Sequence, residues 1–173
     1  MEKTARKDML KFYGRRKGKA IKQNRQAAYN LVMPWAQLQL PEKPAHLSPA
    51  DFFDFPVREV WLEIGFGNGE YLAHIAEKNP DIGMIGCEPF LNGVSALCRD
   101  IKDKKLKNIR IWQEDARLLL PRLKSHSIAH CLLLNSDPWP KKRHHKRRFV
   151  QKETLDELHR LLVEDRLGVS VPM

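Results

Sequence analysis

Short apolar runs alternate with segments of helical periodicity over the last two thirds of the chain. Four apolar runs predict strands at residues 59–65, 84–89, 108–115 and 128–136. Apolar residues spaced three and four apart predict helices over residues 70–78, 94–101, 116–123 and 152–164. Residues 166–173 resemble the start of a fifth strand. This alternation predicts an α/β fold with a mostly parallel sheet and helices on both faces.

The chain divides into three parts by composition. Residues 1–25 are basic, contain few apolar residues and are interpreted as a flexible arm. Residues 26–58 begin with a more apolar stretch that predicts a short helix, and four prolines then predict an irregular connection. The strand and helix pattern occupies residues 59–173, which we expect to form one Rossmann-like domain.

Positive charge is concentrated in two segments. The 173 residues carry a formal net charge of +10, of which residues 1–25 contribute +8 and residues 141–148 contribute +6, so the remainder sums to −4. Clustered cations favour a polyanionic partner, because neutralised phosphates release counterions. For the first segment alone, a solvated tail without a partner is an equally good explanation.

Cysteine usage and hydropathy favour a cytoplasmic protein. The three cysteines are an odd number and contain no Cys-x-x-Cys pair, which indicates reduced thiols. No run of 18 apolar residues predicts a membrane span, and no apolar segment follows the basic N-terminus as in a secretory signal. We therefore expect no membrane association.

A cluster of glycines follows the first predicted strand. Gly65, Gly67 and Gly69 fall between that strand and the next helix, where glycine permits a tight turn and close approach of a ligand. The spacing is G-x-G-x-G, which differs from the G-x-G-x-x-G pattern of dinucleotide-binding proteins. The cluster predicts a cofactor-binding turn, with a simple tight connection as the alternative.

Carboxylates lie in or after each of the four strands: Glu63, Glu88, Asp115 and Asp137. The carboxyl ends of parallel strands meet at one edge of the sheet, where ligands of α/β proteins bind. An acidic edge suits a ligand with a ribose, an adenine amino group and a cationic amine, and it would repel a pyrophosphate. Taken singly, each acid could instead cap a helix or a turn.

The segment after the fourth strand combines Asp137, two prolines and a dense basic run. Lysine and arginine there would hold phosphates beside the expected cofactor. The candidate residues for this phosphate-binding role are Lys141, Arg143, His144, His145, Lys146, Arg147 and Arg148. No matching cysteine or carboxylate spacing accompanies the two histidines, so no metal site is predicted.

Four motifs together resemble the bacterial tRNA (guanine-N7)-methyltransferases: LEIGFGNGE, IGCEPFLNGV, NIRIWQEDA and SDPWPKKRHHKRRFVQ. The resemblance covers roughly residues 12–163 and implies a class I S-adenosylmethionine-dependent methyltransferase fold. It implies S-adenosylmethionine as methyl donor and a guanine of the tRNA variable loop as acceptor. The four carboxylates match cofactor-contacting acids, Lys141 matches a substrate-contacting lysine, and residues 143–148 match an RNA-contacting segment. Asp137 is the candidate catalytic residue, positioning cofactor and base.

The chain departs from the family pattern after the last predicted helix. The family continues to a Thr-Asp motif and further strands, and no Thr-Asp occurs in this chain. We therefore expect a fold that is incomplete at its C-terminus, with an exposed sheet edge that lowers solubility or promotes association. The expected species is a monomer or a weakly self-associating protein. The function expected is tRNA guanine-N7 methylation, with a non-catalytic RNA-binding remnant as the alternative.

Overall fold

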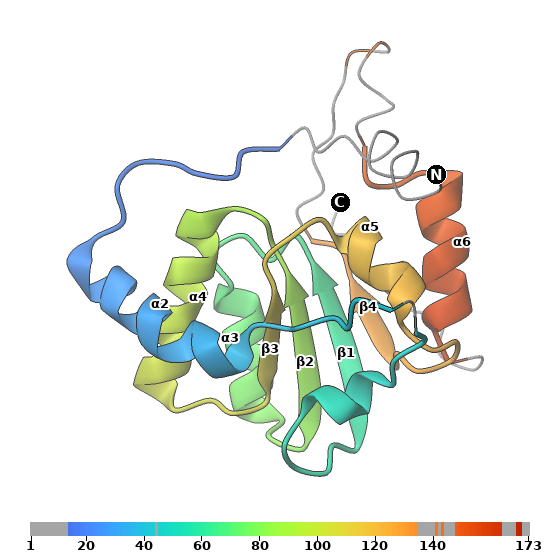
Figure 1. Ribbon diagram of the computed structural model, residues 1–173, viewed down its shortest axis with the longest axis horizontal. Coiled ribbons are helices and arrows are strands. Elements are labelled where there is room, and N and C mark those ends of the chain that lie inside the picture. The colour runs from blue at the N-terminus through green and yellow to red at the C-terminus, as the bar shows by residue number, and fades with distance from the viewer. Residues whose placement is uncertain are drawn as a thin grey trace.

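A computed structural model describes residues 14–43, 45–134, 141, 143 and 148–163, together with the backbone of residues 169–170 (Figure 1). Five parallel strands form one sheet in the order β3-β2-β1-β4-β5. The strands are β1 (Glu59–Ile64), β2 (Ile82–Cys87), β3 (Ile109–Trp112), β4 (His130–Leu132) and β5 (Val169–Ser170). The predicted parallel sheet is confirmed, and the carboxyl ends of its strands share one edge.

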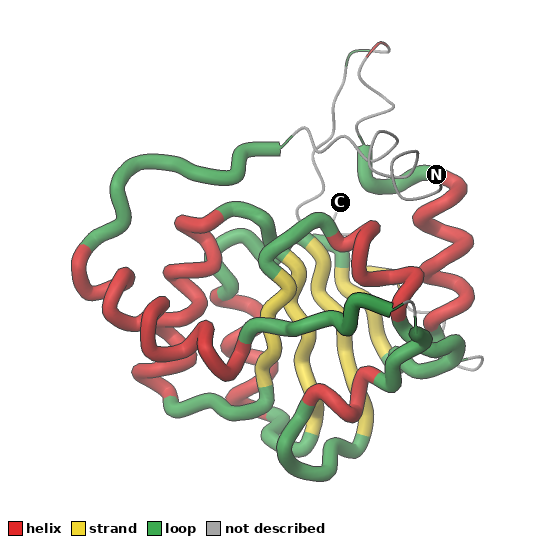
Figure 2. The backbone as a smooth tube through the Cα atoms, in the orientation of Figure 1, coloured by secondary structure: helices red, strands yellow, loops and turns green. Residues whose placement is uncertain are grey.

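Helices cover both faces of the sheet, as the alternating pattern predicted (Figure 2). One face packs against α2 (Gln23–Ala36), α3 (Glu70–Lys78) and α4 (Leu91–Lys104). The other face packs against four further elements: α5 (Ala116–Leu119), the 3₁₀ helices η1 (Pro49–Phe52) and η2 (Leu120–Arg122), and α6 (Lys152–Leu161). Side chains along β1 alternate between the two faces of the sheet. Leu62 therefore points to the face that α5 and α6 cover, and its neighbour Glu63 points to the face that α2, α3 and α4 cover.

Several element boundaries differ from the sequence prediction. Helix α4 extends three residues beyond each end of the predicted 94–101, because its last turn is polar and exposed and carries no apolar periodicity. The helix predicted at 116–123 breaks after Leu119 and continues as a 3₁₀ turn that contains Pro121. Strand β4 has three residues where nine were predicted, because the apolar residues on either side of it are buried without extending the ladder.

The three cysteines are buried and free, in agreement with reduced thiols. Burial raises the pKa of Cys98 and of Cys131 to about 12, so these thiols stay protonated and unreactive at neutral pH. Among the described residues, no helix is both long and apolar enough to cross a membrane.

Asn108 joins the amino ends of β2 and β3 to the end of α3. Its buried side-chain amide donates to the carbonyl oxygens of Ala76, Asn79 and Ile82 at 2.9–3.0 Å. Replacing Asn108 with alanine leaves these acceptors without the amide, and we expect a loss of about 2 kcal/mol in unfolding free energy. Urea denaturation measures this loss.

Asn30→Ala is the matched control, because Asn30 is exposed on α2 and its side chain bonds only the neighbouring Gln26 in the described structure. Its expected cost is below about 0.5 kcal/mol. Equal losses in the two variants would contradict the bridging role of Asn108.

Candidate functional site

The glycine turn lies between β1 and α3 at the carboxyl edge of the sheet. Gly65, Gly67 and Gly69 have φ angles of 73°, 59° and 76°, a region that L side chains rarely adopt. The Gly65 N–H donates to the Cys87 carbonyl at 2.8 Å, which fixes the turn to the end of β2. A Cβ on Gly69 would lie 2.8 Å from the Leu97 side chain on α4. The backbone conformation of the turn therefore requires these glycines. Because glycine has no side chain, the backbone of the turn is exposed to a ligand at the carboxyl edge of the sheet.

Glu88 links the glycine turn to the segment after β2. One carboxylate oxygen accepts from the Gly67 N–H at 3.0 Å, and the other accepts from the Phe90 N–H at 2.9 Å. The two backbone bonds therefore orient the Glu88 carboxylate at the carboxyl edge of the sheet, beside the glycine turn.

Gly93 brings the start of α4 against the same turn. A Cβ at this position would lie 2.1 Å from the Gly67 carbonyl oxygen, so only glycine allows this packing. Sequence reasoning missed Gly93, because it placed the start of the helix at Val94. A glycine in the first turn of an otherwise apolar helix was the available signal.

Glu63 is the most unusual acid of the site. It lies within β1 with 1% of its surface exposed, and its Oε2 has no hydrogen-bond partner among the described residues. Burial raises the pKa of Glu63 to about 7, because a charged carboxylate is poorly solvated there. A buried carboxylate with an open acceptor favours a ligand that brings a hydrogen-bond donor, above all a cationic one.

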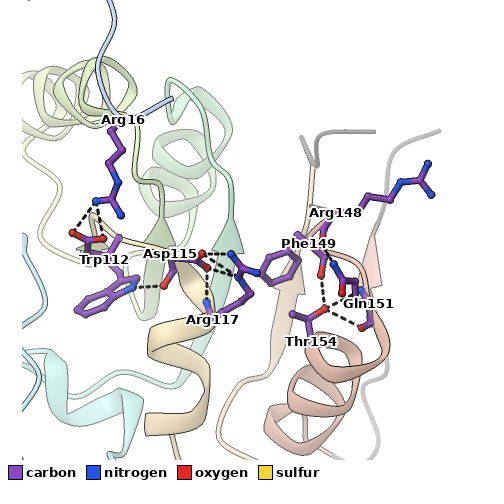
Figure 3. A network of polar contacts seen from close by, with 9 residues as sticks. Arg16, Trp112, Asp115, Arg117, Arg148, Phe149, Gln151 and Thr154 are labelled. Carbon is purple, nitrogen blue, oxygen red and sulfur yellow. Dashed lines mark hydrogen bonds and ion pairs between the residues drawn. The ribbon is translucent and has the colours of Figure 1, made fainter. Parts of the chain in front are cut away.

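Asp115 caps α5 after β3, which is the structural alternative that the sequence left open. Its Oδ1 accepts from the Arg117 N–H at 2.9 Å, and both oxygens bond the Arg117 guanidinium (Figure 3). The residue is 7% exposed. Arg117 was not predicted, although a cation two residues after a capping acid was a visible signal. A ligand at Asp115 would share the carboxylate with this arginine.

Of the basic run at residues 141–148, the structure describes only residues 141, 143 and 148. Lys141 and Arg143 are exposed, and Arg148 is half-buried next to the start of α6. That start is fixed by Gln151, whose N–H donates to Thr154 Oγ1 and whose side-chain amide donates to the Arg148 carbonyl (Figure 3). The predicted site residues Asp137, His144, His145, Lys146 and Arg147 lie outside the described residues.

The structure therefore brings the glycine turn, Glu63 and Glu88 together at one edge of the sheet. Within the described part of the chain, no group of three or more His, Cys, Asp and Glu side chains is arranged to hold a metal ion. The arrangement suits an organic ligand that carries a diol and a cation.

Comparison with known proteins gives a family match over residues 57–167, to a family described as "Putative methyltransferase". The chain is 47% identical over 153 residues to a protein of Paramagnetospirillum magneticum named "tRNA (guanine-N(7)-)-methyltransferase", covering 88% of this chain and 64% of that protein. It is 44% identical over 155 residues to a protein of the same name from Ruegeria, covering 87% of this chain and 60% of that one. The chain thus spans less than two thirds of the length of these relatives.

Among solved structures, a 16S rRNA (adenine(1408)-N(1))-methyltransferase from Catenulisporales acidiphilia matches with a TM-score of 0.51 and 14% identity. The match covers 79% of this chain and 60% of that one. At this identity the match concerns the fold alone.

Proposed function

Because this chain belongs to the family described as "Putative methyltransferase", we propose that it binds S-adenosylmethionine and methylates N7 of a guanine in the tRNA variable loop. The fold is that of the class I S-adenosylmethionine-dependent methyltransferases. The names of the relatives that match most of the chain support the choice of tRNA as substrate. The single observation that carries the proposal is the hydrogen bond from the Gly67 N–H to Glu88, which joins the glycine turn to the acid at the end of β2.

The residues of the edge fit S-adenosylmethionine. We place the two ribose hydroxyls at Glu88, because the Gly67 and Phe90 N–H groups hold its carboxylate at the end of β2, beside the glycine turn. The Oε2 of Glu63, which has no hydrogen-bond partner within the part of the chain that the structure describes, fits the cationic amine of the methionine part. Asp115 supplies a third acid at the end of β3, where we place the adenine amino group. We further propose that Asp137 completes this set after β4.

The reaction needs alignment more than proton transfer. S-adenosylmethionine supplies an electrophilic methyl group on a sulfonium centre, and guanine N7 offers a lone pair without a proton. The chain therefore has to orient the two reactants and exclude water from between them. We assign Asp137 to positioning and to offsetting the positive charge that develops on the purine. Lys141 orients the acceptor nucleotide, and the basic residues 143–148 hold backbone phosphates.

We further propose that the partner is tRNA and that the protein acts in the cytoplasm. The two basic segments favour tRNA over a small acceptor, because their charge far exceeds what one nucleotide requires. We place the activity in the cytoplasm, where tRNA is modified and where buried free thiols stay reduced. We expect a monomer or a weakly self-associating species.

The test is methylation of an unmodified tRNA transcript that carries a guanine in its variable loop. We expect the full chain and S-adenosylmethionine to yield 7-methylguanosine at that position, detected by mass spectrometry of nuclease fragments. A transcript with adenosine at the same position is the matched control and should remain unmethylated. Binding of tRNA with no methylation would contradict the proposal and favour a non-catalytic RNA-binding protein.

A further inference from the structure

The basic arm is attached to the rim of the candidate site through its backbone. The Leu91 N–H donates to the Arg16 carbonyl at 2.9 Å. The Asn92 side chain binds the arm twice, accepting from the Gly18 N–H at 2.8 Å and donating to the Lys19 carbonyl at 2.7 Å. Arg16 also pairs with Glu114, two residues after the end of β3, at 3.0 and 3.2 Å. A short stretch without helix or strand is thus bound to the start of α4 and to the loop after β3.

Close approach at Gly18 makes this attachment specific. A Cβ there would lie 2.9 Å from the Phe90 ring and 3.0 Å from Asn92 Oδ1. Phe90 and Asn92 belong to the segment that begins at Glu88, so the arm lies on the same turn that carries the proposed ribose-binding acid. Figure 1 shows the arm (blue) on the side of the molecule to which the strand arrowheads point.

We propose that residues 14–19 form a tRNA-binding surface that Asn92 and Glu114 hold at the rim of the candidate site. Because the backbone makes most of the attachment, the side chains of Arg15, Lys17 and Lys19 remain exposed. Residues 14–22 carry five cations and no acid. This inference rests on the proposed function for the identity of the polyanion, and tRNA phosphates are the partner that such a row of cations fits.

A purely structural tether is the competing explanation. A tether needs the backbone hydrogen bonds and Gly18, but it has no use for a cation at each of the exposed positions 15, 17 and 19. If the arm binds tRNA, removing its cations weakens tRNA binding and its dependence on salt. If the arm is only a tether, removing the cations changes neither. The slope of log K against log salt is negative, and each phosphate that the protein no longer neutralises makes it shallower by about 0.9.

The first experiment removes charge from the arm. The triple variant Arg15→Gln/Lys17→Gln/Lys19→Gln is compared with Lys102→Gln/Lys105→Gln/Lys107→Gln, which loses the same charge near the amino end of β3, where all three lysines are exposed. We expect the arm variant to bind an unmodified tRNA transcript at least about 10-fold more weakly, with a salt slope shallower by up to about 2.7 for the three cations. The control should lose less than about 3-fold. Equal losses in both triples would overturn the proposal.

The second experiment releases the arm without changing its charge. Asn92→Ala removes both side-chain bonds to Gly18 and Lys19, and we expect faster tryptic cleavage after Arg15, Arg16, Lys17 and Lys19. We expect tRNA affinity to fall about 5-fold. The variant should still melt in one cooperative transition, which shows that it is folded, and its affinity for S-adenosylmethionine should change less than about 2-fold. Unchanged tRNA affinity in a variant whose arm is cleaved faster would overturn the proposal.

Failure of the proposed function is distinguishable from failure of this inference. Arm-dependent tRNA binding without 7-methylguanosine would refute methylation and retain the arm surface. Methylation that is independent of arm charge would retain the function and refute the arm surface.

Discussion

Replacing Glu88 with alanine is expected to weaken S-adenosylmethionine binding at least about 100-fold. Hydrogen bonds to a charged group contribute about 1.5–3 kcal/mol each, so loss of the two bonds to the ribose removes at least about 3 kcal/mol. The variant also loses the bonds from the Gly67 and Phe90 N–H groups that shape the turn. Both effects act in the same direction, and isothermal titration measures their sum.

Glu77→Ala is the matched control for Glu88→Ala. Glu77 is an exposed acid on α3 that pairs with Lys104, away from the glycine turn. Its removal should change cofactor affinity less than about 2-fold. If Glu88→Ala binds the cofactor within about 3-fold of wild type, the assignment of Glu88 to the ribose is wrong.

Features encoded in a short stretch of sequence were predictable. The glycine turn was visible because three positive φ angles within five residues demand glycine, and each of these positions carries one. The parallel sheet was visible because strands covered by helices on both faces have to be apolar throughout, and the burial of all six β2 residues follows that pattern. The positions of Glu63 and Glu88 followed from these elements.

Features that depend on long-range contacts were not predictable. The contact between Gly93 in the first turn of α4 and the Gly67 carbonyl joins positions 26 residues apart, and the local sequence marks Gly93 as unusual without identifying its partner. The attachment of the arm through Asn92 joins positions more than 70 residues apart. The raised pKa of Glu63 likewise depends on what surrounds the carboxyl group in three dimensions, and the sequence does not specify those neighbours.

Glu63 is expected to make the protein less stable as the pH rises from 4.5 to 7. Its pKa is raised by burial from an ordinary 4.5 to about 7 in the folded protein. Below pH 4.5 both states hold the proton, and Glu63 contributes no pH dependence. Between pH 4.5 and 7 the unfolded chain releases the proton while the folded protein retains it, so unfolding becomes easier. Above pH 7 the full cost is present, about 3 kcal/mol at 1.36 kcal/mol per pKa unit.

Glu63→Gln isolates this contribution, because an amide of the same shape cannot ionise. The difference in unfolding free energy between Glu63→Gln and wild type should move in favour of the variant by up to about 3 kcal/mol between pH 4.5 and pH 8. Urea denaturation at several pH values measures this change without requiring the two proteins to be equally stable at any one pH. Glu42→Gln, at an exposed position, should give a curve parallel to wild type.

The cofactor should reverse this dependence. A cationic amine next to Glu63 favours the ionised carboxylate, so S-adenosylmethionine should stabilise the wild type increasingly from pH 5.5 to pH 7. In Glu63→Gln the stabilisation by the cofactor should be weaker and should not increase in this way. A wild-type binding constant that does not change with pH over this range would contradict the proposed contact between Glu63 and the amine. The Glu63 carboxylate would then accept a hydrogen bond from a different group of the ligand.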